Sequence, residues 1–335
     1  MTEQISLENV GLVAIGRNEG DRLKACLNSV RHQLRHIIYV DSGSTDDSVA
    51  FARSIGVVVV ELDLSIPFTA ARARNAGWRR LVELYPSVEF VQFVDGDCEV
   101  AAGWLAIAHQ ALRDHEGDRW AVVCGRRREK YPNESIYNLL CDLEWDTPIG
   151  EAGACGGDSL MRVAALQQVD GFNPSLIAGE EPELCVRLRQ QGWKIWRLDE
   201  EMTRHDAQML RFGQWWKRTQ RAGHAFAEGA WLHGKSEQRH WVKESRSIWI
   251  WGVGIWAIAL LGTWPTSGFS LLLLLAYPAS IARIFLRYRP KLGVKSGFFY
   301  AISCVFGKFP QALGTVQFHW NHLIGKRSQL IEYKA

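Results

Sequence analysis

The chain has 335 residues and a formal net charge of +3, a length that fits one catalytic domain plus an appendage. The near balance of charges excludes nucleic acid as the main partner, since nucleic-acid-binding proteins usually carry a strong basic excess. The seven cysteines show no Cys-x-x-Cys spacing, which argues against a zinc site or a redox pair. No secretory signal opens the chain, so we expect a cytoplasmic domain with reduced thiols.

The first part of the chain alternates short apolar runs with segments of helical periodicity. This alternation predicts an α/β domain, Rossmann-like, with a mostly parallel sheet flanked by helices. The spacing predicts helices over 70–84 and 104–113. Strands are predicted at 10–15, 36–40, 57–62, 88–94 and 120–125.

Polar clusters follow three of these strands directly. They contain Arg17 and Glu19, then Asp41, then the triplet Asp95-Gly96-Asp97. In sheets of this kind, ligands bind outside the carboxyl ends of the strands, so we expect these clusters to share one site. Two carboxylates one residue apart can bind a hard divalent cation, which would neutralise a diphosphate.

The middle of the chain carries further candidates. Residues 126–157 look irregular and polar, and long ordered loops within a domain are usually functional. Gly157 offers close backbone approach to a ligand. A helix is predicted from about 182 to 191, with carboxylates gathered at its N-terminus, and a strand at 193–198.

The C-terminal part has a different character. Residues 248–264 carry no charge and residues 269–286 carry only Arg283, so each segment is just long enough to cross a bilayer core of about 30 Å. Basic residues flank both segments on the outside, which predicts a membrane hairpin with both ends cytoplasmic. A soluble helical hairpin is the alternative, and residues 298–316 look interfacial. The predicted boundaries are 1–208 for the catalytic domain, 209–246 for an interfacial helical region, 247–290 for the hairpin and 291–335 for an interfacial C-terminal segment.

Five motifs occur in an order that is characteristic of one family. They are Val13-Ala14-Ile15-Gly16-Arg17-Asn18-Glu19, Val40-Asp41-Ser42-Gly43-Ser44-Thr45-Asp46, Ala73-Arg74-Asn75-Ala76-Gly77, Asp95-Gly96-Asp97 and Gly179-Glu180-Glu181-Pro182-Glu183-Leu184. Over about residues 8–230 the chain resembles the inverting family 2 glycosyltransferases with the GT-A fold, including membrane-associated bacterial members. The triplet at 95–97 corresponds to the DxD motif of these enzymes.

The resemblance implies roles for individual residues. The metal, Mn²⁺ or Mg²⁺, would be bound by Asp97, Asp95 and His205. The base that deprotonates the acceptor would be Glu181, with Glu180 left open because most relatives have Asp at position 181. The residues implied in nucleotide-sugar binding are Ile15, Arg17, Glu19, Asp41, Arg72, Arg74, Asn75, Asp95, Gly96, Gly157, Arg218 and Arg221.

Several of these residues also have ordinary structural interpretations. Asp41 could serve turn chemistry, and Glu19 could complement a helix dipole. A lone histidine such as His205 is more often structural than a ligand. Arg218 and Arg221 could instead lie on a membrane-surface helix. The sequence leaves these alternatives open.

The resemblance implies a metal-dependent glycosyltransferase of the hexosyltransferase type. It would use a UDP-, dTDP- or GDP-sugar and a hydroxyl acceptor, and the hairpin makes a polyprenyl-linked sugar in polysaccharide or glycolipid assembly the expected acceptor. We expect the inner membrane as its location, with the catalytic domain in the cytoplasm. A nucleotidyltransferase of related fold is disfavoured because Gly16-Arg17-Asn18-Glu19-Gly20 is not a glycine-rich phosphate loop. A non-catalytic membrane scaffold is disfavoured by the intact acidic motifs.

Overall fold

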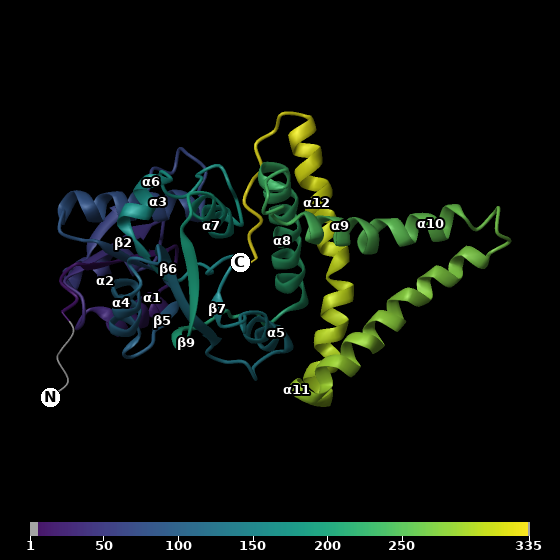
Figure 1. Ribbon diagram of the computed structural model, residues 1–335, viewed down its shortest axis with the longest axis horizontal. Helices are drawn as coiled ribbons and strands as arrows, with labels where there is room; N and C mark the ends of the chain where they lie inside the picture. The colour runs from purple at the N-terminus through teal and green to yellow at the C-terminus, as the bar shows by residue number, and fades with distance from the viewer. Residues whose placement is uncertain (1–5, 334–335) are drawn as a thin grey trace. The chain divides into compact units, whose positions relative to one another are not determined.

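The computed structural model describes residues 6–333 and divides the chain into two compact units. The first unit contains the described residues up to Tyr131 together with Cys141–Ala207. The second unit contains Pro132–Leu140 and the described residues from Gln208 onward. Each unit is described by itself below (Figure 1).

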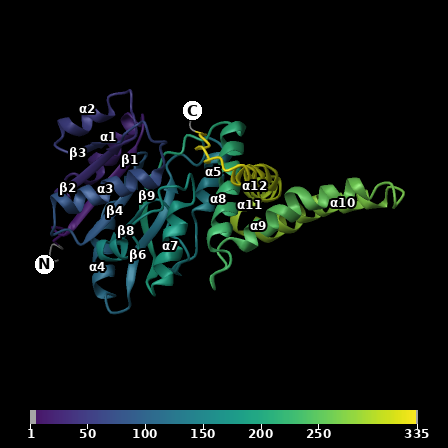
Figure 2. The same ribbon diagram turned by 90° about the horizontal axis from the view of Figure 1, so that it is seen from above.

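A mixed sheet forms the centre of the first unit, in the order β3-β2-β1-β4-β8-β6-β9-β5, with β7 also paired to β9. Figure 2 shows the strands from β3 to β6 lying side by side. The apolar side chains of β1, β2, β4 and β8 are almost completely buried, because helices cover the sheet, whereas those of β3 at its edge are partly buried. The strands are β1 (Val10–Gly16), β2 (His36–Asp41), β3 (Val58–Glu61), β4 (Phe90–Asp95), β5 (Cys98–Val100), β6 (Trp120–Glu129), β7 (Gly150–Glu151), β8 (Ser159–Arg162) and β9 (Lys194–His205).

The register of the parallel strands brings two predicted site residues to the same edge. Gly16 at the end of β1 pairs with Asp41 on β2, and Ile15 pairs with Asp95 on β4. The end of β1 therefore lies between the two aspartates, as the rule for carboxyl ends of strands requires.

The expected parallel arrangement holds for β1 to β4, whereas the other half of the sheet is mixed. β8 is antiparallel to both β4 and β6, and β6 and β9 are parallel. β9 runs from Lys194 to His205, well beyond the predicted strand at 193–198. The acidic residues Asp199, Glu200 and Glu201 hide this extension in the sequence, because they lie on a partly exposed stretch of the strand.

Helices pack on the sheet of the first unit. α3 (Ala70–Leu84) has the bounds predicted from its periodicity, packs on β1 and β2, and begins at Thr69, whose side chain accepts a hydrogen bond from the Arg72 backbone N–H at 3.1 Å. One helix, α5 (Ile136–Glu144), was not expected and interrupts the segment predicted to be irregular; its residues up to Leu140 belong to the second unit and those from Cys141 to the first. The other helices are α1 (Asp21–Val30), α2 (Ser48–Ser54), α4 (Trp104–Asp114), α6 (Val163–Gln168) and α7 (Glu180–Gln190).

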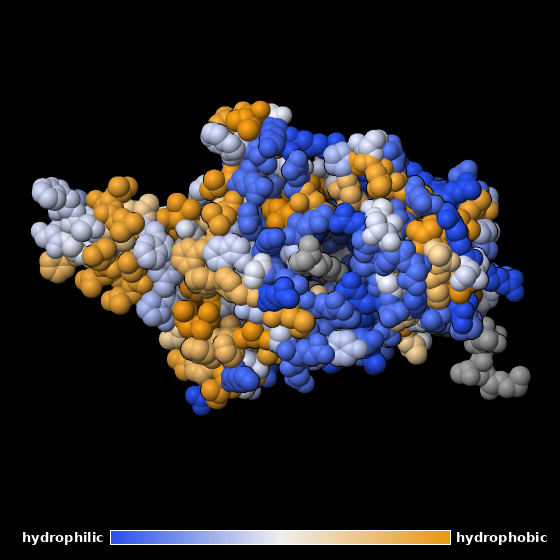
Figure 3. Space-filling model, turned by 180° about the vertical axis from the view of Figure 1, so that it is seen from behind, coloured by the Kyte–Doolittle hydropathy of each residue, from blue (hydrophilic) through white to orange (hydrophobic). Residues whose placement is uncertain are grey.

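The second unit is helical, and two of its helical arms form an apolar hairpin. The Ser270 hydroxyl links the arms by donating to the Ala259 carbonyl at 2.7 Å. The tip of the hairpin is uncovered, and Trp264 there is 94% exposed. In Figure 3 the hairpin lies at the left and is mostly orange and white, the colours of hydrophobic and intermediate residues. Its elements are α8 (Phe212–His233), α9 (Val242–Ile248), the π-helical η1 (Trp249–Gly254), α10 (Ile255–Leu261), the 3₁₀-helical η2 (Phe269–Leu275), α11 (Ala276–Phe306) and α12 (Lys308–Leu323).

Among the described residues, one helical run is long and apolar enough to cross a membrane. It is Phe269–Leu323, which contains an 18-residue window with a mean hydropathy of 1.9, and it kinks at Gly293, whose φ is 77°. The first predicted span, 248–264, is instead divided among α9, η1 and α10. The π-helical turn lies where Gly252 packs against α12: a Cβ there would be 2.6 Å from the Lys308 carbonyl oxygen.

Two glycines let α8 and α12 touch through their backbones. A Cβ added at Gly223 would lie 2.0 Å from the Gln311 carbonyl oxygen, and one at Gly314 would lie 1.9 Å from the Gln220 carbonyl oxygen. No side chain fits in either place, so glycine is required by the close approach of the helices.

Candidate active site

The predicted triplet at 95–97 forms a tight turn against the end of β1. The Gly96 N–H donates to the Ile15 carbonyl at 2.8 Å. A Cβ on Gly96 would lie 3.1 Å from the same oxygen and 3.3 Å from Glu19. The structure therefore brings Ile15, Glu19 and Gly96 together, and the small residue permits the turn that separates Asp95 from Asp97.

Asp95 lies between two guanidinium groups. Arg74 Nη2 is 2.7 Å from Asp95 Oδ1, and Arg127 Nη2 is 3.2 Å from Oδ2. Burial by itself would raise the pKa of Asp95, but the two cations outweigh it and hold that pKa below its ordinary value of 3.8. Asp95 is therefore an ionised carboxylate, and a metal ion there would have to share it with both arginines.

Arg127 and Asp158 belong to this cluster and were not among the predicted site residues. Asp158 is fully buried; it accepts from Arg127 at 2.7 Å, from the Thr203 hydroxyl at 2.7 Å and from the Asp95 N–H at 3.1 Å. Asp158 thus fixes both the turn and the guanidinium. Arg127 follows the predicted strand at 120–125, so the rule applied to the other strand ends could have found it.

Gly157 lies directly against the charged groups. A Cβ at this position would be 2.7 Å from Arg74 Nη2 and 3.0 Å from Asp95 Oδ2. The glycine thus keeps open the space beside the arginine and the aspartate, which is the role expected of a residue that lets a ligand approach.

Asp97 faces His205, which β9 delivers to the same edge. Asp97 Oδ2 is 3.1 Å from His205 Nε2, and both side chains are buried. The other ring nitrogen, Nδ1, is buried without a hydrogen bond, and Glu129 Oε2 lies 3.7 Å from it. Burial would lower the pKa of His205, but the Asp97 carboxylate raises it above 6.5.

This pair fits a divalent cation. The ligand atoms of Asp97, Cys98 and His205 lie within 4.8 Å of one another. A carboxylate oxygen and an imidazole nitrogen are ligands that Mn²⁺ accepts, and a carboxylate beside the second ring nitrogen is a common support for a ligating histidine. Asp97 and His205 would hold the ion. Asp95 stays only a predicted ligand.

The two candidate bases point in different directions. Glu180 Oε1 is 2.6 Å from Arg74 Nη1, so it joins the Asp95 cluster. Glu181 is 4% exposed and accepts from the backbone N–H groups of Cys155, at 2.6 Å to Oε1, and Gly156, at 2.9 Å to Oε2. Desolvation raises the pKa of Glu181 above 4.5. Both carboxylates start α7, whose Gly179 cap is left-handed with φ 77°.

Asp41 closes the turn after β2. Its Oδ2 accepts from the N–H groups of Gly43 and Ser44 at 2.9 Å each, and its Oδ1 accepts from the Tyr39 hydroxyl at 2.9 Å. The aspartate is 2% exposed. Turn chemistry, one of the two alternatives left open by the sequence, is therefore present, and base recognition by Asp41 stays a prediction.

Glu19 and Arg17 lie near the end of β1. Glu19 Oε2 is 2.7 Å from Arg22. Arg17 is exposed, and its guanidinium lies 6.0 Å from the centre of the Phe68 ring. Neither contact is part of the Asp95 cluster, and the roles of both residues in nucleotide binding stay predictions.

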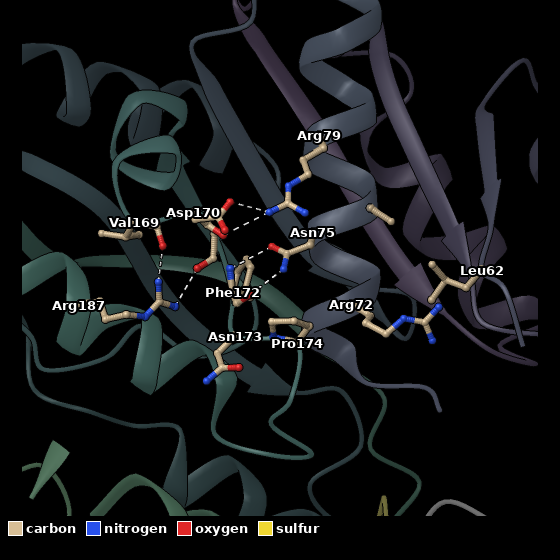
Figure 4. A pocket seen from close by; sticks show the side chains of 12 residues that line it. Leu62, Arg72, Asn75, Arg79, Val169, Asp170, Phe172, Asn173, Pro174 and Arg187 are labelled. Carbon is tan, nitrogen blue, oxygen red and sulfur yellow. Dashed lines mark hydrogen bonds and ion pairs between the residues drawn. The ribbon is translucent and has the colours of Figure 1, made fainter. Parts of the chain in front are cut away.

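Arg72 and Asn75 lie on a different side of α3 from Arg74. They line a pocket of about 580 Å³ beside the loop at 169–174 (Figure 4). Arg72 donates to the Ile66, Pro67 and Asp63 carbonyls, at 2.7, 3.0 and 3.1 Å. Asn75 bonds the Phe172 backbone in both directions, at 2.6 and 2.9 Å. Both side chains thus hydrogen-bond to the backbone of neighbouring loops.

The remaining two predicted residues lie outside the first unit. Arg218 and Arg221 are on α8, where the Arg221 guanidinium lies 5.8 Å from the centre of the Tyr333 ring. The acidic site is built from residues of the first unit alone. A role for either arginine at the diphosphate stays a prediction.

Comparison with known proteins agrees with this architecture. The model of the family described as Glycosyl transferase family 2 matches residues 13–168. Two uncharacterized glycosyltransferases, from Rickettsia felis and Rickettsia conorii, are 39% identical over 54 residues and 42% identical over 53 residues; each match covers 16% of this chain and 19% of the relative. The matches thus span about a fifth of the length of these curated relatives.

A solved structure shares the fold over most of the chain. The mannosyltransferase PcManGT from Pyrobaculum calidifontis, in complex with GDP-Man and Mn²⁺, superposes with a TM-score of 0.64 at 18% identity, covering 93% of this chain and 87% of that chain. Residues 13–168 thus resemble glycosyltransferase family 2, and the superposition shows that the chain has the GT-A fold.

Proposed function

We propose that the protein is an inverting glycosyltransferase that moves a hexosyl group from a nucleoside diphosphate sugar to a hydroxyl acceptor. The observation that carries this proposal is the convergence at one sheet edge of three acidic groups in three different environments. Asp95 is paired with arginines, Asp97 with a histidine, and Glu181 with neutral hydrogen-bond donors. These environments suit an anchor, a cation ligand and a proton acceptor.

The donor diphosphate would lie against the turn at 95–97. A divalent cation bound by Asp97 and His205 would supply Lewis-acid neutralisation of the departing diphosphate. Arg74 is 3% exposed and already held by Asp95 and Glu180, so its guanidinium is oriented before the donor arrives. The space beside Gly157 would admit the sugar.

Glu181 would act as the base. The raised pKa of Glu181 makes it a good proton acceptor, whereas Glu180 is engaged in an ion pair with Arg74, and both observations favour Glu181 as the base. It would take the proton from the acceptor hydroxyl as that oxygen attacks the anomeric carbon. One base on the face opposite the leaving group gives a product with inverted configuration.

The acceptor would be a polyprenyl-linked sugar used in surface polysaccharide or glycolipid assembly, with the enzyme at the cytoplasmic face of the inner membrane. The apolar run Phe269–Leu323 and the exposed apolar hairpin support a membrane location. Lys243 and Arg246 on one arm, and Arg287 and Arg289 on the other, would keep both ends of the hairpin cytoplasmic.

The donor is tested by ligand-dependent stabilisation. UDP, dTDP and GDP are each added to the full chain in detergent, with Mn²⁺, with Mg²⁺ or with EDTA, and the melting temperature is recorded. We expect one nucleotide to raise it, more strongly with metal, because a ligand that binds only the folded state stabilises it by mass action. No shift with any nucleotide would contradict the proposal.

The acceptor is tested with labelled donor sugars and membranes containing polyprenyl-linked saccharides. We expect label in the organic extract. Label that stays entirely in the aqueous phase would exclude a lipid-linked acceptor while leaving transfer itself intact.

A further inference from the structure

Two buried thiols contact the same oxygen of Glu181. Cys155 Sγ is 2.8 Å and Cys185 Sγ is 2.9 Å from Glu181 Oε1, and the two sulfurs are 3.8 Å apart. Cys155 lies in the loop before β8, whereas Cys185 lies one helical turn after Glu181 on α7. The thiols thus reach the carboxylate from two separate elements. Below, Cys155 and Cys185 are called the thiol pair.

Both thiols keep their protons at neutral pH and can act only as donors to a carboxylate. Burial raises the pKa of Cys155 to about 11 and that of Cys185 well above 9.0. Each S–H is a weak donor in general, but a carboxylate acceptor strengthens the bond. The same burial makes these thiols poor nucleophiles, so their contact with Glu181 is one of hydrogen bonding rather than of redox chemistry.

The donors are distributed unevenly over the carboxylate. Oε1 receives three of them: the Cys155 N–H at 2.6 Å and the two thiols. Oε2 receives one, the Gly156 N–H at 2.9 Å. A carboxylate oxygen offers two lone pairs, so the Cys155 N–H takes one lone pair of Oε1 and the two neighbouring thiols share the other. Oε1 then has no capacity left, whereas Oε2 has one place for a further donor.

We propose that the thiol pair positions the base by saturating Oε1 of Glu181, which leaves Oε2 as the atom that receives the proton of the acceptor hydroxyl. This inference rests on the proposed function, because it concerns the base of that reaction. Cys155 and Cys185 are positioning residues and touch no substrate. They restrict the rotation of the Glu181 carboxylate and offset part of the free-energy cost of burying it.

The test compares variants that keep or remove the two donors. Cys155→Ala/Cys185→Ala removes both, and Cys155→Ser/Cys185→Ser replaces each S–H by an O–H. We expect the alanine variant to lose about tenfold in kcat for each hydrogen bond to the charged group, with KM for the nucleotide sugar unchanged. Its acid limb in kcat/KM should also move to higher pH, because the carboxylate loses donors that favour its charged form.

The serine variant should retain most of the wild-type kcat and the wild-type position of the acid limb in kcat/KM. Cys124→Ala is the matched control: this cysteine is 3% exposed in the same core, so the variant loses a buried thiol of the same size but should keep the wild-type pH profile. An alanine variant with wild-type kcat and limb would overturn the positioning role while leaving the proposed function in place.

A second measurement does not depend on activity or on the double variant folding. The S–H stretching bands of the wild-type protein are recorded by Raman spectroscopy and compared with those of Glu181→Ala. We expect two bands of strongly hydrogen-bonded thiols that shift toward the free-thiol position in the variant, where only the longer contacts of Cys155 with the Gly156 carbonyl, the Ser159 hydroxyl and Cys185 remain. Wild-type bands already at the free-thiol position would overturn the inference. A wild-type protein that transfers no sugar would overturn the proposed function itself, whatever the bands show.

Discussion

The negative charges of Asp95 and Glu181 are compensated in different ways. Both are acidic groups of one site. Asp95 is compensated by the full charges of Arg74 and Arg127, which lower its pKa. Glu181 is compensated only by neutral N–H and S–H donors, and desolvation raises its pKa.

The difference teaches how the two carboxylates can divide the work. A group that stays ionised can orient cations and a diphosphate, whereas a group whose proton is exchanged needs a pKa nearer the working pH. The presence of a carboxylate in an acidic motif does not set this division, because both residues have that in common. Their neighbours set it.

The largest expected effect comes from removing the exchangeable proton site. Glu181→Gln keeps the shape of the side chain but cannot accept a proton, so turnover should fall by about 10²–10⁴-fold. Steady-state release of the nucleoside diphosphate measures it. Glu180→Gln loses only an ion pair to Arg74 and should fall less; the reverse order would assign the base to Glu180.

The ion pairs in the Asp95 cluster are tested by the free energy of unfolding. Arg127→Gln leaves the fully buried Asp158 without its cation, and removing one partner of a buried pair costs about 3–5 kcal/mol. Denaturant unfolding measures the loss. Arg128→Gln is the control, since Arg128 is 56% exposed and lies 3.5 Å from Glu201; equal losses in the two variants would contradict the buried role of Arg127.

Asp97→Asn tests the proposed cation ligand, which is paired with a histidine rather than with arginines or neutral donors. We expect turnover to fall by about 10²–10³-fold, as for other groups that stabilise transition-state charge, and the metal-dependent part of nucleotide binding to disappear. Asp118→Asn is a matched control, because Asp118 also contacts a histidine, His115, at 2.7 Å, but is 59% exposed. Undiminished turnover in Asp97→Asn would remove the cation from the mechanism.

The smallest effect is a shift on the pH axis. The base must be ionised to act, so kcat/KM should fall as pH falls through the raised pKa of Glu181, and this limb should lie above pH 4.5. Asp95 should add no limb there, because its pKa is below 3.8. Measured at saturating Mn²⁺, which keeps His205 in its neutral ligating form, the residual rate of Glu181→Gln should be flat over the same range; a persisting limb would assign the titration to another group.

Much of the first unit could be predicted from residue patterns. The bounds of α3 follow from its apolar period and the cap at Thr69. Asp41 and Asp95 lie at the same edge of the sheet, on either side of β1, because parallel strands end at one edge. Local patterns were sufficient there because the residue periodicity predicts each helix and strand, and a parallel sheet then places the strand ends at one edge.

Other features depend on contacts between distant segments and could not be predicted. Cys155 and Cys185 are 30 residues apart, and nothing in their spacing indicates a shared carboxylate. The helix α5 is a different case: Ile136, Leu139, Leu140 and Leu143 recur at helical spacing, so the periodicity rule could have found it within the segment that was predicted to be irregular. Asp41 shows the opposite case: its place at the edge was predictable, but its carboxylate accepts three hydrogen bonds, from Gly43, Ser44 and Tyr39, which compete with the ligand role.

The paired glycines of α8 and α12 have a mechanical consequence for the second unit. Because Gly223 and Gly314 each face a carbonyl oxygen of the other helix, sliding one helix along the other by a residue would press a side chain into that oxygen. The crossing is locked in a single register, so bending of the helical run beyond it is left to the kink at Gly293.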